Sequence, residues 1–188
     1  LSKVNTFSTG MSNGAELSYL LACEASSYFR AVVPVAGTMM EWWYQTCEPD
    51  IARPILEIHG TSDNVTWWDG DAQDTGGWGP YMGVYDVIEL WRDINSTEIV
   101  TYDTIPDTYQ NDGSYVVTEK YQDGINSNEV WLYKIIDGGH DWEESICEYV
   151  ELTIGSVDCT NCSFDDESCE SDDDCEDGET CVDGNCID

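Results

Sequence analysis

Residues Gly10-Met11-Ser12-Asn13-Gly14 place a serine between two glycines, directly before an amphipathic run. This spacing is typical of a nucleophile elbow, a tight turn from a strand into a helix that exposes the serine oxygen. A Cβ atom at Gly10 or Gly14 would collide where the helix folds back on the strand. A strand-like stretch before the turn and a helix-like stretch after it favour a catalytic Ser12 over a glycine-rich turn with an incidental serine.

A serine hydroxyl is a weak nucleophile and needs a base beside it. His140 follows an apolar strand-like run through a glycine-rich loop, which is a suitable place for that base. His59 ends a buried run and is expected to make a local hydrogen bond instead. Asp63 lies just past that run, and the order Ser12, Asp63, His140 is the order described for α/β-hydrolases. The other acids in suitable places are Asp69, Asp71 and Asp141.

The strands and helices that must position these residues can be predicted from the first part of the chain. Strands are expected at residues 4–8, 31–36, 55–58, 98–102, 115–121 and 130–136, and helices at 12–25, 84–94 and 145–154. This order predicts an α/β fold with a mostly parallel sheet and flanking helices. Because the carboxyl ends of parallel strands meet in one crevice, Ser12, Asp63 and His140 are expected to converge there.

Five blocks recur in family order: TGMSNGAELSYLLACE, FRAVVPVAGTM, RPILEIHGTSDNV, YDVIELWRDIN and VWLYKIIDGGHDW. Together they resemble the secreted polyhydroxybutyrate-depolymerase and feruloyl-esterase-like α/β-hydrolases, over roughly residues 4–142. The resemblance implies a partial α/β-hydrolase domain at residues 1–155 that begins at the elbow. It also implies Ser12 as nucleophile, Asp63 as acid, His140 as base and the backbone N–H of Asn13 as an oxyanion donor.

The reaction implied by this resemblance is ester hydrolysis through an acyl-enzyme. Candidate substrates are aryl or acetyl esters on polysaccharide, and short hydroxyalkanoate polyesters. The resemblance further suggests a disulfide between Cys23 and Cys47. Five tryptophans could form an aromatic wall for the substrate or could pack in the core and loops; they are Trp42, Trp43, Trp67, Trp68 and Trp78.

Members of this family carry strands before the elbow, together with a loop that gives the second oxyanion donor. We expect an upstream segment or another chain to supply them. Without a neighbour, the strand at residues 4–8 would be an apolar sheet edge, and such an edge favours pairing. A second copy of this chain is one candidate for that neighbour.

The composition changes near Gly155, after which an acidic cysteine-rich module is expected at residues 156–188. Residues 158–188 hold six of the nine cysteines and thirteen acids, but no lysine or arginine. Cys169, Cys175, Cys181 and Cys186 are spaced as in short disulfide-bonded modules, with three connectivities open. We expect no cofactor and no metal, although the acids at residues 172–177 keep calcium as an alternative without the EF-hand register.

A formal net charge of −33, with six lysines and arginines, repels nucleic acid and anionic membranes. No run of about 18 apolar residues is present, so no membrane span is expected. The cysteines and three N-glycosylation sequons, at Asn64, Asn95 and Asn161, predict a secreted, extracellular glycoprotein. The alternative to a secreted serine esterase is an extracellular structural or assembly-forming glycoprotein that reuses the hydrolase fold without turnover.

Overall fold

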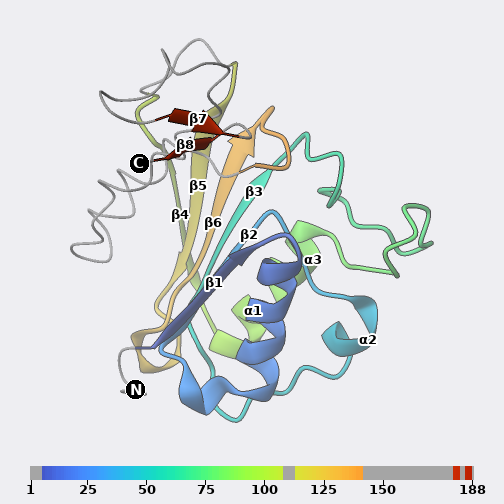
Figure 1. The fold of residues 1–188 in the computed structure, drawn as a ribbon. Helices are drawn as coiled ribbons and strands as arrows, with labels where there is room; N and C mark the ends of the chain where they lie inside the picture. Colours follow the sequence, from blue (N-terminus) through green and yellow to red (C-terminus); the bar gives the residue numbers. More distant parts are fainter. Residues whose placement is uncertain (1–5, 108–112, 142–179, 183–184, 188) are drawn as a thin grey trace. The chain divides into compact units, whose positions relative to one another are not determined.

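A mixed sheet of six strands dominates the computed structural model, which describes residues 6–107, 113–141, 180–182 and 185–187 (Figure 1). The strand order is β1-β2-β3-β6-β5-β4. The strands are β1 (Phe7–Met11), β2 (Ala31–Val35), β3 (Ile55–Gly60), β4 (Ile99–Thr104), β5 (Tyr115–Gln122) and β6 (Val130–Ile136). With its flanking helices, this sheet confirms the predicted α/β class.

Strands β1, β2, β3 and β6 run parallel to one another, and β5 and β4 extend the sheet in antiparallel pairing. β3 is buried along its whole length, as expected for an apolar run in a parallel sheet. β1 is an edge of the sheet that the described residues form. The sequence placed this strand at residues 4–8, whereas its pairing with β2 continues to Met11, opposite Val35.

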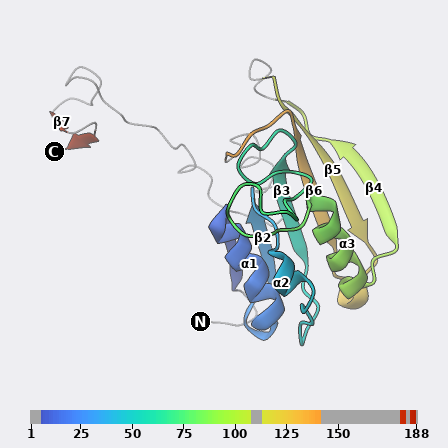
Figure 2. The same ribbon diagram turned by 90° about the vertical axis from the view of Figure 1, so that its right-hand side faces the viewer.

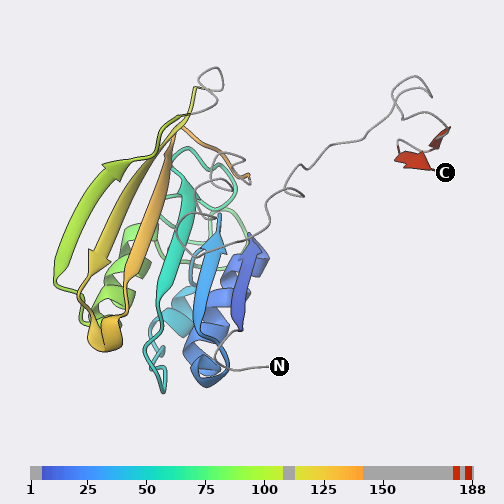
Figure 3. The same cartoon turned by 90° about the vertical axis from the view of Figure 1, so that its left-hand side faces the viewer.

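Three helices cover one face of the sheet, as Figures 2 and 3 show from opposite sides. They are α1 (Asn13–Glu24), α2 (Glu41–Tyr44) and α3 (Val84–Asn95), with 3-10 turns at Ser26–Tyr28 and Ile125–Ser127. The sequence predicted α1 and α3 but not the single turn of α2. The apolar face of α3 is buried against the sheet, with Trp91 fully buried beside Tyr19 of α1. This core fixes α1 against the sheet, with its first turn directly after the carboxyl end of β1.

The chain divides into two compact units, Leu1–Trp142 and Glu143–Asp188. In the second, β7 (Thr180–Val182) and β8 (Asn185–Ile187) pair antiparallel, with Cys181 opposite Cys186. Several predictions fall outside the described residues. They are the domain boundary near residue 155, the helix at 145–154, and the roles of Asn161, Cys169 and Cys175. No helix in the described part of the chain is long and apolar enough to cross a membrane.

Candidate active site

Ser12 lies at the turn between β1 and α1, in a backbone conformation that non-glycine residues rarely adopt. Its φ is 55° and its ψ is −119°. Ser12 N–H donates to the Val35 carbonyl (2.9 Å), while the Ser12 carbonyl accepts from Ala15 and Glu16 at the start of α1. Such a conformation costs about 1–3 kcal/mol and is concentrated at active sites. The turn therefore holds Ser12 in a strained position at the carboxyl edge of the sheet.

The two glycines of the elbow differ in their surroundings. A Cβ atom at Gly10 would lie 2.7 Å from the Gly14 carbonyl carbon and oxygen, as the sequence predicts. A Cβ atom at Gly14 would meet nothing within 4 Å, so the predicted collision at Gly14 is wrong. The helix approaches the strand at Gly10, whereas a Cβ atom added at Gly14 would point into open space. The sequence reading missed Gly37, where a Cβ atom would lie 2.6 Å from the Ser12 carbonyl oxygen.

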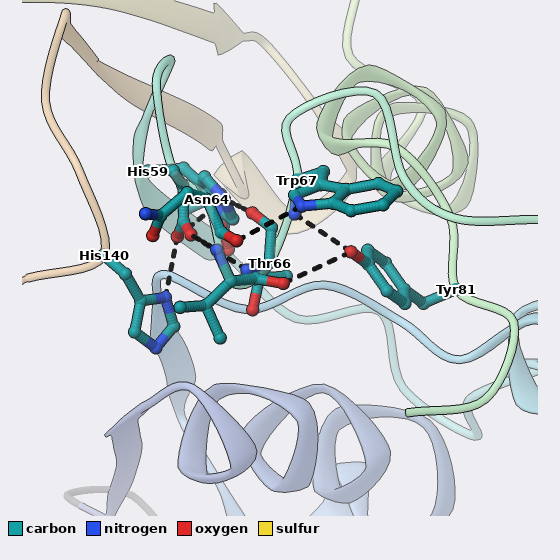
Figure 4. Close-up of polar contacts among 9 residues, drawn as sticks. His59, Asn64, Thr66, Trp67, Tyr81 and His140 are labelled. Carbon is teal, nitrogen blue, oxygen red and sulfur yellow. Dashed lines mark hydrogen bonds and ion pairs between the residues drawn. The ribbon is translucent and has the colours of Figure 1, made fainter. Parts of the chain in front are cut away.

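Asp63 and His140 are hydrogen-bonded to each other at the same edge of the sheet. Asp63 follows β3 and His140 follows the neighbouring parallel strand β6, and His140 Nδ1 lies 2.8 Å from Asp63 Oδ2 (Figure 4). Because a carboxylate only accepts, Nδ1 carries the hydrogen, and Nε2 is left free to accept a proton. The imidazole thus has the tautomer that a general base needs.

Backbone groups of its own loop hold the Asp63 carboxylate in place. Asp63 Oδ1 accepts from the N–H groups of Val65 and Thr66, each at 2.8 Å, and the residue is 5% exposed. Gly60 brings the two loops together, because a Cβ atom there would lie 2.3 Å from the Gly139 carbonyl oxygen. Of the other candidate acids, Asp71 accepts from Gly76 N–H within its own loop. Asp63 is therefore the acid that orients His140.

His59 lies fully buried behind this pair and bonds locally, as predicted. Its Nδ1 is 2.9 Å from Glu57 Oε1, and its Nε2 is 2.8 Å from the Thr66 carbonyl oxygen. Tyr19 donates to Glu57 Oε2 (2.8 Å), so a buried polar chain runs from α1 to the site. The sequence reading missed Glu57. Its signal is an acid inside an apolar strand, two residues before a histidine and hence on the same face.

Ser12 lines a cavity of about 130 Å³ together with Asn13, Glu16, Val65, Thr66, Trp78 and Tyr81. Among the described residues, the Asn13 N–H has no hydrogen-bond partner, as an oxyanion donor requires. The Ser12 hydroxyl also makes no hydrogen bond there, so the structure brings Asp63 and His140 into contact but does not join Ser12 to His140. Of the five tryptophans, Trp78 is the one that lines the cavity.

The predicted aromatic wall is wrong for Trp43 and Trp68. Trp43 is 7% exposed within the core, and Trp68 packs against that core, with its ring edge-on to His59. Trp42 and Trp67 are exposed but do not line the cavity. These four side chains lie in loops or in the short α2, where the sequence shows no periodicity that separates core from surface.

Glu16 gives the cavity a negatively charged wall. It lies one helical turn after Ser12 and therefore on the same face of α1. Burial raises the pKa of its carboxyl group, and among the described residues this group has no hydrogen-bond or ion-pair partner. No described lysine or arginine lines the cavity, and Arg30 and Arg53 precede β2 and β3 at the opposite edge of the sheet.

The described part of the chain also tests two of the predicted modification sites. Cys23 and Cys47 form the disulfide that the family resemblance implies. Asn64 is exposed beside the site, whereas Asn95 is fully buried. Asn95 Nδ2 donates to the carbonyl oxygens of Arg53 and Trp91, so it has no free hydrogen for a glycan bond. The predicted glycosylation of Asn95 is therefore wrong in the folded protein.

The chain matches no known protein-family model, and a comparison with curated proteins gave no match.

Proposed function

We propose that this protein is a serine hydrolase of carboxylic esters, with Ser12, Asp63 and His140 as its catalytic triad. The hydrogen bond from His140 Nδ1 to the buried Asp63 carboxylate carries the proposal, because it leaves Nε2 as a base at the edge of the sheet where Ser12 lies. The strained turn at Ser12 supports it, since strain at a non-glycine residue is concentrated at functional sites.

The chemistry would follow the ordinary acyl-enzyme route. Ser12 Oγ attacks the ester carbonyl carbon while His140 Nε2 takes the hydroxyl proton. The Asn13 N–H donates to the oxyanion that forms. His140 then gives the proton to the leaving alcohol, and the acyl group stays on Ser12. A water molecule, deprotonated by His140, attacks the acyl-enzyme and releases the acid and free Ser12.

The size and lining of the cavity favour small acyl groups. A volume of about 130 Å³ suits an acetyl or short hydroxyacyl group, and Trp78 and Tyr81 offer ring surface for the alcohol or aryl part. We therefore propose acetyl or aryl esters on polysaccharide, or short polyesters, as substrates. These are the substrates that the resemblance to polyhydroxybutyrate-depolymerase and feruloyl-esterase-like α/β-hydrolases implies, and we propose that fold family for the first unit.

The proposed setting is extracellular. The disulfide between Cys23 and Cys47 supports an oxidising compartment, since such bonds are rare in reducing ones. The exposed Asn64 keeps its sequon as a proposed glycan site next to the cavity.

The position of β1 at the edge of the sheet supports a second candidate function, assembly with another chain segment. This strand ends the sheet of the described residues, and its Phe7 side chain is 58% exposed. An upstream segment, another chain or a second copy could pair there. If the site performs no turnover, the protein would be a structural or assembly-forming glycoprotein built on this edge.

Steady-state hydrolysis of 4-nitrophenyl acetate and of an acetylated sugar tests the esterase proposal. Asp63→Asn keeps the size of the side chain but loses the charge that orients His140, so kcat should fall about 10⁴-fold. Asp69→Asn removes the same charge from an exposed side chain that does not line the cavity, and it should leave kcat unchanged. Equal kcat values for the two variants, or no hydrolysis by the native protein, would contradict the proposal.

A further inference from the structure

The hydrogen-bond partners of His59 show which of its ring nitrogens carry a hydrogen. It is 0% exposed, and its Nε2 lies 2.8 Å from the Thr66 carbonyl oxygen and 3.5 Å from Asp63 Oδ2. A carbonyl oxygen only accepts, so Nε2 carries a hydrogen. The same Asp63 oxygen that holds His140 therefore also faces an N–H of His59 from behind.

The other side of the ring requires one more proton. His59 Nδ1 lies 2.9 Å from Glu57 Oε1, and Glu57 is 1% exposed. With a hydrogen already on Nε2, this contact needs a proton either on Nδ1 or on the carboxyl oxygen. In both cases the two residues share one proton and are neutral together. Tyr19 donates to the second oxygen, Glu57 Oε2, so it does not supply that proton to the ring.

We propose that Glu57 and His59 are a proton-holding positioning pair for Asp63. While the pair keeps its shared proton, His59 Nε2–H holds the Thr66 carbonyl and faces Asp63 Oδ2. The N–H of the same Thr66 holds Asp63 Oδ1. His59 thus fixes both the loop and the carboxylate that orients His140.

Loss of the shared proton to solvent would reverse these contacts. Glu57 would become a full carboxylate, and the one remaining ring hydrogen of His59 would move to Nδ1 to meet it. Nε2 would then present a lone pair to the Thr66 carbonyl oxygen and to Asp63 Oδ2, and both contacts would become repulsive. The loop and Asp63 would lose their support from behind.

The surroundings hold this proton to a higher pH than the free side chains would. Burial raises the pKa of Glu57 to about 7. Burial opposes a charge on His59, but the hydrogen bond with Glu57 raises the pKa of His59 overall. Both shifts favour the protonated pair in the folded state. The stability that they contribute is therefore fully present below the ordinary pKa values of the two side chains and is lost as the pH rises through the raised values, about 7 in the case of Glu57.

In the described part of the chain, the other titratable groups beside the pair are Tyr19 from α1 and Asp63 from the following loop, with Lys134 on the neighbouring strand β6. Lys134 is the register partner of His59, but its Nζ is bonded to Glu119 and to the Tyr85 hydroxyl. It therefore does not compensate a charge on Glu57.

Glu57→Gln removes the proton that the pair can lose but keeps the shape of the side chain. The Gln amide can donate to His59 Nδ1 and accept from Tyr19, but it has no proton to lose. In its catalytic consequence the inference rests on the proposed esterase function.

The kcat of the wild type should then fall tenfold or more as the pH rises from 7 to 10, with KM unchanged. The kcat of the Gln variant should not fall over this range. Tyr19→Phe keeps the pair and should keep the alkaline fall. An alkaline fall in the Gln variant equal to that of the wild type would overturn the proposal.

The two histidines of the chain allow a readout that needs no catalysis. In ¹⁵N-histidine-labelled protein, His59 should show a hydrogen on Nε2 at pH 6 and on Nδ1 at pH 9.5, whereas Glu57→Gln should keep Nε2–H at both. A His59 ring with one unchanged tautomer in the wild type would overturn the proposal. A switching tautomer in a protein that hydrolyses no ester would support the pair and contradict the esterase function.

Discussion

Replacement of Gly10 by alanine tests the geometry of the turn that exposes Ser12. The new Cβ atom would lie 2.7 Å from the Gly14 carbonyl carbon and oxygen and 2.8 Å from its Cα. Carbon contacts are comfortable at about 3.5–4.0 Å, so the first turn of α1 would have to move by about 1 Å. Overpacking costs about 1–3 kcal/mol. Because the obstacles here are backbone atoms, we expect a loss of about 2–3 kcal/mol.

Gly14→Ala is the matched control, since its Cβ atom would meet nothing within 4 Å. Alanine is favoured over glycine inside a helix by about 0.5–1 kcal/mol, so this variant should be as stable as the wild type or more stable. Urea unfolding followed by tryptophan fluorescence would measure both, with similar m-values expected. Equal destabilisation by the two substitutions, or a Gly10→Ala variant as stable as the wild type, would refute the packing described here.

Three further predictions concern Glu16, the disulfide and Asn95. Glu16 should favour an ester with a cationic alcohol over its neutral isostere by a few-fold in kcat/KM. That preference should vanish in Glu16→Gln and be lost as the pH falls through the pKa of Glu16, which burial raises above its ordinary value; equal selectivity in both proteins would contradict the role. The Cys23–Cys47 bond closes a separation of 24 residues, so the double alanine variant should lose about 3 kcal/mol of unfolding free energy in urea; a loss below ~1 kcal/mol would argue against it. Peptide mapping of native material should find Asn95 unmodified, and a glycan there would show that its buried contacts are absent.

The candidate triad could be predicted from the sequence because each member follows a strand, and each strand is recognisable from a short run of neighbouring residues. Apolar runs before Ser12, Asp63 and His140 define strands, and parallel strands bring their carboxyl ends together. The adjacency of β3 and β6 is not local. The chain places α3, β4 and β5 between them, and only pairing in space brings His140 next to Asp63.

The errors arise where a side chain's surroundings depend on distant parts of the chain. Gly14 has the same local signature as Gly10, yet only one of them faces a backbone atom. Trp43 and Trp78 both lie outside long helices and strands. Trp43 is nevertheless buried in the core, whereas Trp78 is 68% exposed. Asn95 belongs to a sequon, but its amide is used by Arg53, Trp91 and Asn128 inside the fold.

Covalent labelling of native protein with a fluorophosphonate, followed by peptide mass spectrometry, tests the central claim most directly. An activated serine beside a base and an oxyanion donor should be captured at Ser12, and His140→Ala should slow that capture by several orders of magnitude. Ser62, an exposed serine next to Asp63, should stay unlabelled in the same sample. Folded protein in which Ser12 reacts no faster than Ser62 would contradict the assignment of this site as a serine hydrolase.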